Sequence, residues 1–334
     1  MKILENVEAY KVVDPMFEGI RVIMSYLGEP YSPQYMQGIS GGAFRVATGC
    51  PSRPTCCNMM WITELIKLLG YEYKEYPCTS PGTDTCTGTG KDGKNLMDEM
   101  IGAVMAEIDS GKPALVWHAF TSAEWDVVCG YDEVKGFFFG RGSYRGFEGE
   151  GYVSEPWDRA AKVVGSVPAF GAVTIGAKTG TLDVRKAEIA ALRDAVTHAR
   201  TEKIAPEPTG WWSYEGLQSL RKWSEAYNSP GKERDAADAY CFQVYHSTHA
   251  AAPNFLSEIA PHFEGAAGKC LIEAAGHMEK EAAIFKQCWP YLFWDSPWGV
   301  NEERSHKVAP LLCEIADHYE RAIVCLEKAL AVIG

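Results

Sequence analysis

Hydrophobic residues recur at helical spacing in three segments of the N-terminal half. The pattern predicts helices over residues 16–27, about 58–69 and 96–110. Gly28 and Gly70 follow the first two segments at the position where glycine commonly ends a helix. These segments therefore provide three amphipathic helices for one core.

Short apolar runs between turn residues predict strands. In the segment GKPALVWHAFTSAEWDVVCGYDE, residues 111–133, a Gly-Lys-Pro turn leads into a strand over 114–117, and a polar connection leads into a second strand over 127–130. Two further strands are predicted over 136–140 and 172–175. Helices and strands interspersed in this way indicate an α+β domain.

The pattern changes near residue 180. From Asp183 onwards the apolar positions follow helical periodicity, as in Ile189, Leu192 and Val196, with hardly any strand signal. Proline and glycine clusters divide this region into five or six helices. We therefore predict two domains, an α+β domain over 1–178 and an all-α domain over 179–334.

Composition limits the classes of function. The chain has 334 residues and a formal net charge of −12, from 32 basic and 44 acidic side chains. Nucleic acids and anionic membranes require a basic surface, so neither is expected as a partner. Because no secretory signal and no run of about 18 apolar residues is found, we expect a cytoplasmic protein with reduced thiols. Five cysteines fall in predicted helices, where they are expected as small hydrophobic residues: Cys241, Cys270, Cys288, Cys313 and Cys325.

Several short motifs occur in a familiar order. A helix ending in glycine is followed by GGAF (41–44), LGYEY (69–73), GKPALV (111–116) and VVCGYD (127–132), and then by a helical tail. This order resembles the papain-like fold. More narrowly, it is similar to the family typified by the N-terminal domain of butirosin-biosynthesis protein H, an acyltransferase-related group with a helical extension. The resemblance implies a papain-like N-terminal domain followed by a helical C-terminal domain.

The same resemblance implies where thiol chemistry would lie. A papain-like enzyme carries a cysteine at the start of its first long helix, where the helix dipole lowers the thiol pKa, and a histidine on the facing strand. Here the helix starts with Asp14, Pro15 and Met16, and the histidine position is Glu124. The expected Cys/His pair is therefore missing.

A relocated pair is the alternative. Cys57 precedes the helix predicted over 58–69, and His118 directly follows the strand over 114–117. Such a pair would make the chain an active thiol hydrolase or acyltransferase related to natural-product biosynthesis. The simpler interpretation is that Cys57 is a buried residue at a helix start and His118 a polar strand end.

Neither a metal nor a cofactor is expected. The loop cysteines lack the paired spacing of zinc knuckles, although a metal or a disulfide among them stays open: Cys50, Cys56, Cys57, Cys78 and Cys86. Three Glu/His pairs are four residues apart and are interpreted as ion pairs or caps: Glu258 and His262, Glu273 and His277, and Glu314 and His318. His246 and His249, three apart, are the best remaining ligand candidates.

These observations favour a protein that has kept a papain-like scaffold, has lost thiol catalysis, and binds a small molecule or peptide in a cleft between its two domains. The candidate ligand-binding residues surround the second strand of the 111–133 segment: Trp117, Glu124, Trp125, Asp126 and Arg141. Self-association through the helical half is a further alternative.

Overall fold

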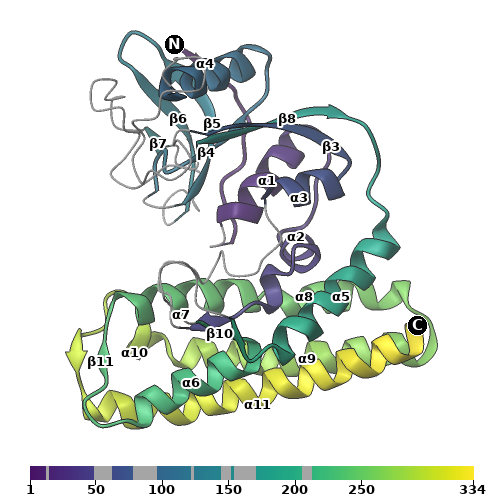
Figure 1. Cartoon of the computed structure of the whole chain (residues 1–334), viewed down its shortest axis with the longest axis vertical. Helices are drawn as coiled ribbons and strands as arrows, with labels where there is room; N and C mark the ends of the chain where they lie inside the picture. Colours follow the sequence, from purple (N-terminus) through teal and green to yellow (C-terminus); the bar gives the residue numbers. More distant parts are fainter. Residues whose placement is uncertain are drawn as a thin grey trace. The chain divides into compact units, whose positions relative to one another are not determined.

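The chain forms two compact units (Figure 1). The computed structural model describes residues 1–12, 15–48, 62–77, 96–121, 124–143, 152–153, 171–204 and 213–334. The first unit comprises Met1–Pro33 and Trp61–Leu182, and the second comprises Gln34–Met60 and Asp183–Gly334. The fold is mixed α+β with a helical C-terminal region. No helix in the described ranges is long and apolar enough to cross a membrane.

This division differs from the expected boundary at 178/179 in two respects. The second break falls at Leu182, and residues 34–60 group with the helical unit although they precede most of the α+β unit in the chain. Hydrophobic periodicity reports local structure and does not reveal which core a segment joins.

The first unit is built on an antiparallel sheet in the order β3-β8-β4-β5-β6-β7, with β1 paired to β5. Its strands are β1 (Lys2–Ile3), β3 (Tyr71–Tyr76), β4 (Ala114–Trp117), β5 (Trp125–Asp132), β6 (Phe137–Arg141), β7 (Tyr152–Val153) and β8 (Ala172–Lys178). All four predicted strands are confirmed. Strand β3 was not predicted, although tyrosine and charged residues alternate over its first four positions, as in a half-buried strand.

Helices cover both faces of this sheet (Figure 1). Helices α1 (Pro15–Tyr26) and α3 (Ile62–Leu68) lie on one face and α4 (Leu96–Asp109) lies on the other. Gly28 and Gly70 end α1 and α3 in left-handed conformations, with φ of 87° and 86°, as the sequence indicated.

Glycine lets α1 approach the sheet closely. A Cβ at Gly19 would lie 2.6 Å from Leu115 Cδ2 on β4 and 3.6 Å from Val127 Cγ2 on β5. Phe17, Ile20 and Ile23 are fully buried beside it. Helix α1 is therefore fixed against the β4–β5 pair.

The second unit is mainly helical. Its helices are α2 (Pro33–Ile39), the 3-10 helix η1 (Gly42–Phe44), α5 (Val184–Arg200), α6 (Gly216–Asn228), α7 (Ala236–His249), α8 (Ala252–Ile259), the 3-10 helix η2 (Ala260–His262), α9 (Gly265–Gln287), α10 (Trp289–Leu292) and α11 (Glu302–Ile333). The long helices α9 and α11 run side by side, and α5 and α6 also pack on α11.

Short strands also occur in this unit, contrary to the expectation of an all-α domain. Strands β2 (Ala47–Thr48), β9 (Lys203–Ile204) and β10 (Ser213–Glu215) form one sheet, and β11 (Glu233–Arg234) pairs with β12 (Gly299–Val300). Each spans two or three residues, which is too short for an alternating pattern to be recognised in the sequence.

Buried polar contacts hold residues 34–48 in the helical unit. Arg45 Nη2 lies 2.7 Å from both carboxylate oxygens of Asp194, and His198 Nε2 lies 3.0 Å from the amide nitrogen of Val46. The hydroxyl of Tyr319 donates to the carbonyl of Phe44 at 2.8 Å. This segment is thus tied to helices far away in sequence.

Candidate functional site

Four of the predicted site residues gather at one end of the β4–β5 hairpin. Trp117 pairs with Trp125 across the two strands, and their rings meet edge to face with centroids 5.6 Å apart. Glu124 and Asp126 flank Trp125, and both carboxyl side chains are buried. The hairpin register therefore places Trp117, Glu124, Trp125 and Asp126 at one end of the hairpin, with the two tryptophan rings on one face of the sheet and the Asp126 carboxyl on the other.

Asp126 is held by the turn that follows β4. Its Oδ2 accepts the backbone amides of Phe120 at 2.7 Å and Thr121 at 2.9 Å. Within the described residues, Oδ1 has no hydrogen-bond partner. A Cβ at Gly142 would overlap Oδ1, so glycine is required there.

Burial sets the ionisation of Asp126. The side chain is fully buried, and desolvation raises the pKa of its carboxyl from 3.8 to about 7, against the hydrogen bonds from Thr121 and Phe120, which lower it. A carboxyl with this pKa can donate or accept a proton near neutral pH. Such a group also has a purely structural use, because its hydrogen bonds shape the turn at 118–121.

His118 lies at the same end of the hairpin. Its amide donates to the carbonyl of Glu124 at 2.6 Å, which holds the backbones of these two candidate residues together. His118 has φ of 57°, a left-handed conformation that costs energy for a residue with a Cβ. Partial burial lowers the pKa of its imidazole, so the ring is neutral at pH 7.

The predicted residues do not all share one face of the sheet. Arg141 pairs with Val127, and Val127 pairs with Leu115 on the face that α1 covers. Because strand residues alternate between faces, Asp126 points to the opposite face. Arg141 Nε donates to the carbonyl of Val7 at 3.0 Å, which ties the N-terminal segment to β6.

Tyr10 belongs to this site and was missed in the sequence. Its hydroxyl donates to the carbonyl of Trp125 at 3.0 Å. Burial and the nearby carboxylates Asp126, Glu18 and Glu124 raise the pKa of Tyr10 well above its usual value. The segment before α1 has no periodicity of its own, so its buried tyrosine carried no recognisable signal.

Cys57 lies outside the described residues, as do the other loop cysteines, Cys50, Cys56, Cys78 and Cys86. Helix α1 begins at Pro15, and its first turn contains Met16 and Phe17 and no thiol. The cysteines predicted in helices form no disulfide within the part of the chain that the structure describes: Cys241, Cys288 and Cys325 are buried, Cys270 is partly buried and Cys313 is exposed.

The histidines singled out in the second unit have specific partners. His249 Nδ1 lies 3.0 Å from Glu281 Oε1, and its Nε2 donates to the carbonyl of Arg45 at 3.1 Å. Burial opposes a charge on His249, but Glu281 and the Arg45 carbonyl outweigh it and raise its pKa. His249 is therefore an internal ion-pair residue.

His262 pairs with Glu188 at 2.8 Å, whereas the sequence spacing had paired it with Glu258.

Comparison with protein-family models finds no match, and no curated protein matches the chain. The hairpin end itself offers three groups for chemistry. They are the buried Asp126 carboxyl with a pKa of about 7, the buried Glu124 carboxyl and the neutral His118 imidazole.

Proposed function

We propose that the Met1–Leu182 unit is a papain-like domain that has lost thiol catalysis and binds a small molecule or peptide at the end of the β4–β5 hairpin. Two observations together carry this proposal. The first helix has no cysteine at its start, and a buried glutamate, Glu124, stands where the resemblance would place the base histidine. Without a thiol at the start of this helix and a histidine base, the thiolate nucleophile that acyl transfer on this scaffold requires cannot form there.

The contacts of Asp126 support a binding role. One of its oxygens is committed to the turn amides, and the other has no partner within the described residues. A buried polar atom without a partner costs about 1–3 kcal/mol, and a polar ligand group would relieve that cost. In its protonated form Asp126 offers a donor, which suits a ligand carbonyl or carboxylate.

A binding experiment tests this role with a matched control. Asp132, at the other end of β5, is also buried, and its Oδ1 accepts the amides of Val134 and Lys135 at 3.1 and 3.0 Å. We expect at least one of a set of short acyl-coenzyme A esters and dipeptides to raise the melting temperature of wild type and of Asp132→Leu. The shift should be lost in Asp126→Leu, which offers neither a donor nor an acceptor, and in Glu124→Gln. Equal shifts in all four proteins would exclude this site.

An active thiol hydrolase or acyltransferase that uses Cys57 and His118 is the second candidate. The strained backbone of His118 and its neutral imidazole favour it, because such strain clusters at functional sites. Incubation with an acyl thioester followed by intact-protein mass measurement separates the two proposals. Loss of thiol catalysis predicts no acyl adduct. An adduct that forms in wild type and disappears in Cys57→Ala would establish the enzyme.

A further inference from the structure

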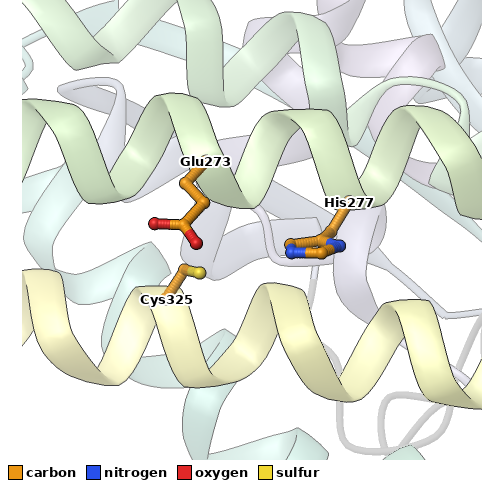
Figure 2. A group of neighbouring side chains, drawn as sticks. All are labelled: Glu273, His277 and Cys325. Carbon is orange, nitrogen blue, oxygen red and sulfur yellow. The ribbon is translucent and has the colours of Figure 1, made fainter.

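Helices α9 and α11 of the second unit bring three metal-binding side chains together. Glu273 and His277 lie one turn apart on α9, and Cys325 faces them from α11 (Figure 2). One ligand atom from each lies within 4.8 Å of the other two, and within the described ranges this is the one such group of three or more His, Cys, Asp or Glu side chains.

A second imidazole, His318, lies beside this group, outside the set of atoms that are all within 4.8 Å of one another. His318 Nδ1 on α11 is 3.4 Å from His277 Nδ1. Zinc binds imidazole nitrogens at about 2.0–2.1 Å, and tetrahedral geometry then separates two nitrogens by about 3.4 Å. The two imidazoles therefore already have the spacing of a pair of ligands on one zinc ion.

We propose that Glu273, His277, His318 and Cys325 bind one zinc ion that joins α9 to α11. Thiolate, imidazole and carboxylate are the three kinds of side chain that zinc prefers, and a mixed set with sulfur disfavours magnesium and calcium. This site lies in the second unit and does not rest on the proposed ligand site of the first.

The surroundings suit metal entry. Glu273 is exposed, His277 and His318 are partly exposed and Cys325 is buried. An ion can therefore reach the site from solvent and bind the sulfur at its buried side. Zinc binding displaces the Cys325 proton, which is released to solvent as the zinc–sulfur bond forms.

Metal titration of the full-length reduced protein tests the proposal. After treatment with a chelator, we expect one equivalent of Co²⁺ to produce the visible bands of a tetrahedral site and a thiolate-to-cobalt charge-transfer band, and one equivalent of Zn²⁺ to remove both. Zinc should also raise the melting temperature and protect Cys325 from N-ethylmaleimide.

Variants assign the ligands. Cys325→Ser should abolish the charge-transfer band, while His277→Gln, His318→Gln and Glu273→Gln should each weaken zinc binding by about ten- to a hundredfold or more. Cys313→Ser and His306→Gln, which change exposed residues on the same helix α11, are the controls and should bind as wild type does.

Three results would overturn the site. The first is a wild-type protein without a tetrahedral cobalt spectrum. The second is a charge-transfer band that survives in Cys325→Ser. The third is zinc affinity unchanged by His318→Gln, which would remove the fourth ligand. Circular dichroism of each variant shows whether the helices are intact, and the wild-type spectrum decides the question even if a variant fails to fold.

Discussion

At the scale of single residues, Asp126 shows how position on a strand sets chemistry. Asp126 and Asp132 lie at opposite ends of β5 and each accepts two backbone amides. At Asp126, burial outweighs these hydrogen bonds and raises the pKa of the carboxyl to about 7. The sequence identified Asp126 as a candidate, but it could not reveal the surrounding apolar packing that sets its ionisation.

This shift predicts a pH dependence of stability. The folded-state pKa lies above the unfolded value. The contribution of Asp126 to the free energy of unfolding is therefore fully present below about pH 4 and is lost as pH rises through about 7. Each pKa unit is worth about 1.4 kcal/mol, so this group lowers the free energy of unfolding by up to about 4 kcal/mol over that interval. Asp126→Asn, which imitates the protonated form, should lose this fall in urea titrations at pH 4 to 8, and Asp132→Asn should keep it. An unchanged slope in Asp126→Asn would show that Asp126 is ionised throughout.

At the scale of elements, close helix–sheet contact positions the hairpin. The apolar face of α1 was predicted from its spacing, and its members Phe17, Ile20 and Ile23 are indeed buried. The spacing did not indicate how near the helix comes. Gly19 has no Cβ, and this allows Leu115 and Val127 to pack directly under the helix.

Gly19→Ala should therefore destabilise the protein even though alanine favours helices. Its Cβ would lie 2.6 Å from Leu115 Cδ2 and 2.9 Å from the Tyr10 hydroxyl, and overpacking of this kind costs about 1–3 kcal/mol. Gly102→Ala in α4 is the control, because nothing lies within 4 Å of its Cβ, and it should be neutral or stabilising by up to about 1 kcal/mol. Thermal unfolding of both variants measures the difference. Equal stability of the two would show that α1 can shift to admit a methyl group.

Also at this scale, pairing between helices explains why the candidate zinc site was not expected. Glu273 and His277 share one face of α9, and two donors alone are most simply interpreted as an ion pair. The other donors, His318 and Cys325, come from α11, and only helix packing places them nearby.

At the scale of the whole molecule, the second unit is completed by a segment from the N-terminal part of the chain. The carbonyl of Arg45 accepts a hydrogen bond from His249, and its guanidinium binds Asp194. His198 and Tyr319 contact Val46 and Phe44. Without residues 34–48 these buried polar groups would lose their partners.

A fragment of residues 183–334 should therefore fold poorly alone, because each buried polar group left without its hydrogen-bond partner costs about 1–3 kcal/mol. A synthetic peptide of residues 34–48 should restore a cooperative thermal transition when added. The same peptide with Val46→Pro, which lacks the backbone N–H that donates to His198 Nε2, should restore less. Cooperative unfolding of the fragment at the same temperature with and without peptide would contradict this.

The sequence alone determined the local elements. Apolar spacing, helix-ending glycines and short apolar runs identified α1, α3, α4 and the strands β4, β5, β6 and β8, together with the helical C-terminal region. It also established that the first helix starts without a cysteine, whereas a histidine position at Glu124 is what the papain-like resemblance implies. These properties depend on residues close together in the chain, where periodicity and turn chemistry act directly.

Only the tertiary structure decided which distant residues meet. It grouped residues 34–60 with the helical unit, paired His262 with Glu188, and brought Glu273 and His277 on α9 next to His318 and Cys325 on α11. These pairings depend on how helix faces pack across large separations in the chain. A single sequence carries no local signal of that packing, because the same apolar face can be buried against more than one partner.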